Sequence, residues 1–172
     1  EVHELGGDVD YRLRRLASAE TWITPLGAEA QAALARLFRE LVHRPAGAGT
    51  IAIEGRELPV RGYGDGVAWF DFATLCEGPR SAADYLELAR DFHTLLLADV
   101  PVLDGRREDA ARRLVTLVDV LYDHGVNLIV AAAAAPEALY RGDALAFEFE
   151  RTRSRLIEMR TEAYLHSAHT GQ

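Results

Sequence analysis

Two runs of mostly apolar residues, at 94–100 and 126–133, limit the folds that this chain can adopt. A strand that is apolar without alternation is typical of a sheet covered on both faces. Between the two runs, residues 106–122 place apolar side chains every three or four positions, as one face of a helix does. Because strand, helix and strand in this order pair in parallel, the sequence predicts a parallel α/β layer.

An antiparallel hairpin is predicted before this layer. Apolar residues alternate at 51–53 and 58–60, on either side of a Glu-Gly turn. Pro59 has no backbone N–H to donate, so we expect the returning strand at an edge of the sheet. The glycine-rich residues 62–66 predict a flexible turn before a strand at 67–72.

Local signals place the starts of two helices. Thr24 can cap a helix, and Pro25 suits its first position. Ser81 and Asp84 have the spacing of a capping box. Helices are predicted at residues 25–41, 81–92, 106–122, 136–142 and 150–165, and a strand or entering arm at 1–12.

These elements together predict an α/β fold. Its sheet is small, mostly parallel and flanked by helices, with an antiparallel hairpin and a long C-terminal helix. No linker or low-complexity tract divides the sequence, so residues 1–172 are expected to form a single domain. The chain begins at Glu1 and not at a methionine, which favours a piece of a longer protein.

Composition excludes several classes of function. A formal net charge of −8 argues against nucleic acid as the main partner, because phosphate backbones are bound by an excess of basic residues. The single cysteine, Cys76, excludes an internal disulfide and fits a cytoplasmic setting. No apolar stretch is long enough to span a bilayer, so stable membrane insertion is not expected.

A phosphate-binding loop is not recognisable in the sequence. Such a loop needs glycines whose N–H groups face phosphate, a lysine, and a Ser or Thr for magnesium. The chain has no Lys-Ser or Lys-Thr pair after a glycine-rich turn. Residues 62–66 carry Asp65 at their centre, and its charge would repel phosphate. The histidines show no metal-ligand spacing, so no metal site is predicted.

Four residues remain as candidates for chemistry. Asp99 ends a buried strand, where ATPases place the carboxylate that holds magnesium, but the sequence favours the alternative, an Asp that caps the next loop. Arg80 lies in a turn before a helix and could reach a phosphate or a partner's carboxylate; the alternative is a solvated turn residue. Arg151 and Arg155 are one helical turn apart and could face an anion, or belong to a surface charge network.

Collinear segments of the chain resemble one known family, the ZapE family of P-loop ATPases. The segments are GVAWFDF at 66–72, LCEGPRS at 75–81, DY at 84–85, FHT at 92–94, DVP at 99–101, LYD at 121–123, PEALY at 136–140, FEFERT at 147–152 and SRLIEM at 154–159, with DYR at 10–12 near the start. The resemblance covers nearly the whole chain.

The resemblance implies that the intact protein is an AAA-type ATPase that uses ATP and Mg²⁺. Its Walker A loop, Walker B acids and sensor strand are expected before Glu1, so this chain would be the C-terminal portion without the nucleotide cradle. Expected partners are the upstream ATPase core, a second copy of the chain and, in bacterial members, a tubulin-like cell-division protein. Mitochondrial members are linked to protein quality control.

Three readings of the function follow. In the first, the chain belongs to an ATPase and supplies Arg80, Arg151 or Arg155 to a site built elsewhere. In the second, it is a non-catalytic module that binds a division or quality-control client. In the third, it is an unrelated flavodoxin-like domain with a ligand near Asp99 and Ala133. We also hypothesise that the run from Asp99 to Met159 is a degenerate copy of an ATPase core that lacks the P-loop, which requires the strands at 94–100 and 126–133 to be parallel neighbours.

Overall fold

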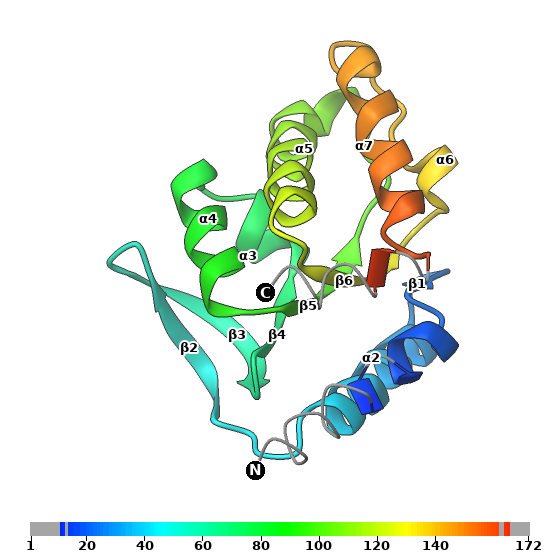
Figure 1. Ribbon diagram of the computed structural model, residues 1–172. Helices are drawn as coiled ribbons and strands as arrows, with labels where there is room; N and C mark the ends of the chain where they lie inside the picture. The colour runs from blue at the N-terminus through cyan, green and yellow to red at the C-terminus, as the bar shows by residue number, and fades with distance from the viewer. Residues whose placement is uncertain (1–10, 13, 162–163, 166–172) are drawn as a thin grey trace.

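A six-stranded sheet lies between two layers of helices in the computed structural model, which describes residues 11–12, 14–161 and 164–165 (Figure 1). The strands are β1 (Trp22–Ile23), β2 (Gly47–Ile53), β3 (Arg56–Gly64), β4 (Val67–Asp71), β5 (Thr94–Val100) and β6 (Asn127–Ala132). The helices are α2 (Ala28–Leu41), α3 (Phe72–Cys76), α4 (Ala82–Asp91), α5 (Glu108–Asp123), α6 (Pro136–Leu139) and α7 (Ala146–Glu158), with a 3₁₀ turn, η1, at Gly105–Arg107.

The strand order is β1-β6-β5-β4-β3-β2. The pairs from β1 to β4 are parallel, and β2 and β3 add an antiparallel hairpin at one side of the sheet. This confirms the predicted α/β class. It also meets the requirement that β5 and β6 are parallel neighbours, with Leu95 opposite Leu128.

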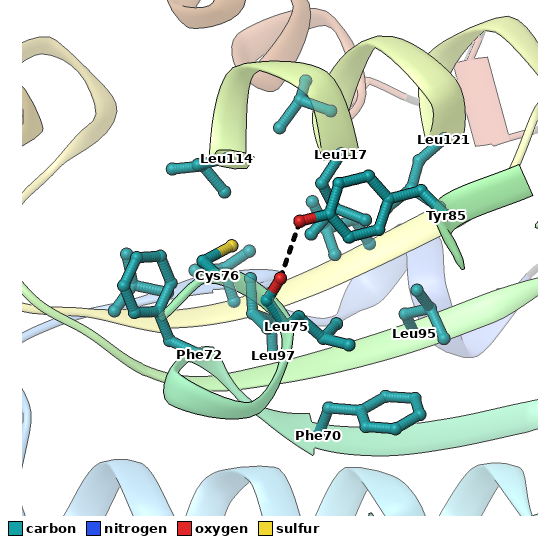
Figure 2. Packing of buried hydrophobic residues seen from close by; sticks show 14 of the residues in the cluster. Phe70, Phe72, Leu75, Cys76, Tyr85, Leu95, Leu97, Leu114, Leu117 and Leu121 are labelled. Atoms are coloured by element: carbon teal, nitrogen blue, oxygen red, sulfur yellow. Dashed lines mark hydrogen bonds between the residues drawn. The ribbon is translucent and has the colours of Figure 1, made fainter. Parts of the chain in front are cut away.

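The strand β5 is buried on both faces, as its mostly apolar sequence without alternation predicts. Leu96 and Ala98 pack with α2 in one apolar cluster. Leu95 and Leu97 face the other way and pack with α3, α4 and α5, as Figure 2 shows. Only Asp99 is exposed in this strand. The sheet therefore presents its polar groups at its carboxyl edge.

The sequence misplaced Pro59, because β3 lies between β2 and β4 and is not an edge strand. The strand β4 pairs only with Gly62–Gly64 of β3, so Pro59 lies in the half of β3 that has one neighbour. The missing N–H of proline is tolerated there for the reason that holds at an edge. The predicted flexible turn also shrinks to Asp65 and Gly66, because Gly62–Gly64 belongs to β3.

The predicted ends of the helices also shift. The helix α2 begins at Ala28 and not at Pro25, because Trp22 and Ile23 pair with β6 and the next residues connect strand to helix. Phe72 starts α3 instead of ending a strand. The final helix, α7, covers Ala146–Glu158 rather than 150–165.

The structure also bears on the end of the final helix, on the helix predicted at 136–142 and on the arm predicted at 1–12. After a break at 159–161 the chain is helical again at Tyr164 and Leu165, and the Tyr164 hydroxyl donates to the carbonyl of Val126 at 2.8 Å. The helix predicted at 136–142 ends at Leu139. Residues 1–10 of the predicted arm lie outside the described residues, and Tyr11 and Arg12 are helical.

Gly64 provides a test of the packing between β3 and the end of α2. A Cβ atom at this position would lie 2.6 Å from the backbone oxygen of Arg44 and 2.9 Å from the nitrogen of Ala46. Backbone atoms cannot rotate away, so Gly64→Ala should lower the free energy of unfolding by about 1–3 kcal/mol. Chemical denaturation measures this value.

Gly105→Ala is the matched control, since nothing lies within 4 Å of a Cβ there. We expect it to change the free energy of unfolding by no more than about 0.5 kcal/mol. Equal effects of the two substitutions would contradict the proposed contact at Gly64.

Candidate functional site

Arg80 lies in the turn between α3 and α4, and backbone carbonyls fix its guanidinium. The Nε atom donates to the Thr74 oxygen at 2.9 Å, and Nη1 donates to the Pro79 oxygen at 3.2 Å. Carbonyls orient a guanidinium without neutralising its charge. Arg80 is therefore held in one place as a cation at the start of α4.

Arg56 and Asp84 hold this turn against the hairpin. Arg56 donates to the Pro79 oxygen at 2.7 Å and to Asp84 at 2.5 Å. Asp84 also accepts from the backbone N–H of Ser81 at 2.7 Å, which completes the predicted capping box. Burial alone would raise the pKa of Asp84, but the hydrogen bonds from Ser81 and Arg56 outweigh burial and lower it.

A cavity of about 210 Å³ opens beside this turn, between the start of α4 and the first half of α5. Arg80, Arg112 and Arg113 line it, together with Asp109. Three arginines against one aspartate give a formal balance of +2, on a chain whose net charge is −8. The cavity is a local cationic site on an acidic protein.

The arginines of the cavity are not paired with carboxylates. Arg113 donates to the backbone oxygen of Cys76 at 3.2 Å, which fixes it as Arg80 is fixed. Arg112 is exposed on α5. Within the described part of the chain, none of the three arginines forms an ion pair. Their charge is available to an anion.

The Tyr85 hydroxyl and the Cys76 thiol near the cavity are both protonated and unreactive at neutral pH. Tyr85 is buried, and its hydroxyl donates to the Leu75 oxygen at 2.6 Å (Figure 2). Burial raises the pKa of Tyr85 and that of the Cys76 thiol far above neutral pH. Neither group can serve as a nucleophile or a general base at pH 7, so the site is suited to binding rather than to covalent chemistry.

Arg151 and Arg155, which the sequence singled out as a pair, do lie together on α7. Both donate to the same carboxylate on α5, Asp119, at 3.0 Å and 2.5 Å. The guanidinium of Arg155 also stacks over the ring of Tyr122 at 4.7 Å. The pair fastens α7 to α5, and its charge is partly neutralised by Asp119.

Asp99 lies at the carboxyl end of β5, where the sequence placed it. Its backbone is left-handed, with φ of 63°, a conformation that Asp tolerates better than most residues. One carboxylate oxygen accepts from Gln31 at 2.9 Å, and the other lies 3.4 Å from Arg61, which also contacts Asp71 at 2.7 Å. The guanidinium of Arg61 beside this carboxylate opposes a divalent cation at the same place, because like charges repel.

The glycine-rich stretch does not fit a phosphate either. Gly64 packs against the backbone of residues 44–46, so its surroundings are filled. The carboxylate of Asp65 accepts from the backbone N–H groups of His43 and Arg44 at 2.7 Å and 3.0 Å. The backbone N–H groups that could donate to a bound anion here already donate to the carboxylate of Asp65.

No group of three or more His, Cys, Asp or Glu side chains is placed to hold a metal ion within the ranges described above. In the same ranges, none of the helices has both the length and the hydropathy needed to cross a membrane.

Sequence reasoning found Arg80 but missed its neighbours Arg112 and Arg113. They lie 32 and 33 positions further along the chain, on a different helix, so no local spacing joins them to Arg80. The available signal was an Arg-Arg pair in the polar part of an amphipathic helix. It could not be interpreted until α5 was known to pack beside α4.

The structure is that of an α/β domain with parallel central strands and a cavity lined by arginines. Sequence comparison identifies the family to which this domain belongs. The sequence matches the AFG1-like ATPase family over residues 1–168. The chain belongs to this family.

Individual relatives agree with this assignment. The chain is 40% identical to cell division protein ZapE of Escherichia coli K12 across 98% of its own length. It is 30% identical to lactation elevated protein 1 homolog B of Danio rerio across 95% of its length. The chain spans 45% of the first relative and 40% of the second. No solved structure matches it significantly.

Asp84 offers a test of how the turn is held. Asp84→Asn removes the charged acceptor of Ser81 and Arg56, and should lower the free energy of unfolding at pH 7 by about 1–3 kcal/mol. Because the pKa of Asp84 is lowered in the folded state, its contribution is present at neutral pH. The contribution fades as the pH falls below about 4, through the folded pKa.

Urea denaturation of both proteins between pH 7 and pH 3 measures this difference, which should shrink toward acid. Asp91→Asn, at the exposed end of the same helix, is the control and should follow the wild type. A gap between Asp84→Asn and wild type that stays constant with pH would refute the role of the carboxylate.

Proposed function

We propose that this chain is the part of an ATP-hydrolysing protein that supports a nucleotide site formed elsewhere in the same protein. One observation carries the proposal: all 19 basic residues of the chain are arginines, and it contains no lysine. A P-loop needs a lysine to reach the outer phosphates of the nucleotide. These residues cannot supply it, while their family hydrolyses ATP.

The geometry of the sheet edge supports the same conclusion. Asp99 accepts a hydrogen bond from Gln31 and lies beside Arg61, whose positive charge opposes Mg²⁺ there. In the proposed function, ATP and Mg²⁺ are bound by the ATPase core, and this chain docks on that core in the cytoplasm. Arg80 is the candidate donor, because Arg151 and Arg155 already share Asp119.

The first test separates the chain from the whole protein. The purified 172-residue chain should show no saturable binding of a fluorescent ATP analogue at micromolar concentrations, and no ATP hydrolysis. In the whole protein, Arg80→Gln should lower kcat/KM for ATP by about tenfold or more, the effect of removing a charge-assisted contact to phosphate. Steady-state phosphate release measures this value.

Arg151→Gln is the matched control for the same charge change and should alter kcat/KM by less than about threefold. Hydrolysis by the isolated chain would overturn the proposal. Equal losses from the two substitutions would remove Arg80 from it.

A second candidate function is a non-catalytic interaction module, and one surface favours it. Phe147 is 80% exposed and Ile157 is 40% exposed, both on the helix α7. Aromatic side chains, Phe among them, are enriched at protein interfaces relative to the rest of the surface. The relative from Escherichia coli is named as a cell division protein, so a division client is the partner to test first.

The two candidates differ in how they respond to Phe147→Ser. If α7 is the docking surface, the substitution should weaken binding to the client about tenfold or more, as loss of an exposed aromatic anchor does. Hydrolysis of ATP by the whole protein should stay within about twofold. Surface plasmon resonance with a tubulin-like division protein measures the binding.

Ala144→Ser, on the exposed surface just before α7, is the control. The neighbouring Leu145 is buried, so a serine there would disturb the fold and could not serve as a control.

A further inference from the structure

We propose that the cavity lined by Arg80, Arg112 and Arg113 binds a single phosphate group, as inorganic phosphate or as the end of a nucleotide. The inference rests on the proposed function only for the source of the phosphate. Nothing in it requires the chain to hydrolyse ATP.

The size of the cavity selects the ligand class. Sites for drug-sized ligands measure roughly 300–1,000 Å³, whereas this cavity measures about 210 Å³. At roughly 30 Å³ for each water, that volume holds about seven waters. One tetrahedral oxyanion fits such a space, and the rest of a larger ligand would lie outside the cavity.

The charge of the cavity selects an anion. Arg80 and Arg113 are anchored by backbone carbonyls of residues 74, 76 and 79, so each guanidinium is oriented but not neutralised. One guanidinium group can bind two oxygens of a phosphate at once, through two parallel N–H donors. Three like charges around one cavity also repel one another, and a bound dianion relieves that repulsion.

The acidic balance of the rest of the chain does not cancel this attraction. At 0.1 M salt, charges are screened over about 10 Å, so a distant carboxylate contributes little inside the cavity. Two carboxylates of α5 act locally. Glu108 interacts electrostatically with Arg112, and Asp109 lines the cavity itself, one helical turn before Arg112 and Arg113. The carboxylate of Asp109 opposes an anion in the cavity, which makes Asp109 a useful probe.

The experiment is a titration of the 172-residue chain with inorganic phosphate, followed by two-dimensional NMR of backbone amides and arginine Nε–H groups. We expect saturable shifts at Arg80, Ser81 and Arg112 that sodium chloride at equal ionic strength does not produce. Arg112→Gln, an exposed position, should weaken phosphate binding roughly tenfold, because it removes a charge-assisted contact. Asp109→Asn should strengthen phosphate binding.

Arg90→Gln is the matched control: it removes one arginine from the exposed C-terminal end of α4, away from the cavity lining, and should leave the phosphate affinity unchanged. Competition by ATP but not by adenosine would identify a nucleotide phosphate as a source, and its absence would identify the free anion. Shifts that do not saturate, or an equal loss in Arg90→Gln, would overturn the inference. The proposed function fails on a different result, ATP hydrolysis by the isolated chain.

Discussion

The burial of β5 on both of its faces is the constraint on which the rest of the structure depends. Leu95 and Leu97 pack under α3 and α5, while Leu96 and Ala98 pack on α2. A slip of this strand by one residue would exchange its two faces, so side chains of different size and shape would meet each close-packed helix layer. The register of β5 therefore fixes both helix layers and the position of the polar carboxyl edge at Asp99.

The hydrogen-bond acceptor of each arginine determines whether its positive charge remains available to bind an anion. Arg151 and Arg155 share the carboxylate of Asp119, and their role is to join two helices. Arg80 and Arg113 are held by carbonyl oxygens, which carry only partial charge. Residues of the same type thus have opposite uses, and the difference lies in the acceptor that orients each guanidinium.

Local sequence predicted what local interactions control. The capping box at Ser81 and Asp84 was predicted and is present, since its partners are three residues apart. The turn at Glu54 and Gly55 also follows from neighbouring residues. Pro59 was misassigned to an edge strand, because a proline indicates only that one backbone hydrogen bond is missing. The sequence does not show that β4 pairs with Gly62–Gly64 alone and leaves Pro59 without a neighbour on that side.

The amino-acid sequence by itself determined the class of fold, the family and the absence of a lysine for a P-loop, because each depends on which residues follow one another. Only the tertiary structure brought Arg80 beside Arg112 and Arg113 around one cavity, and placed Arg61 and Gln31 against Asp99. The physical reason is that electrostatic sites depend on distances in space. Those distances were set by the packing of α4 and α5 on the buried sheet, between residues far apart in the chain.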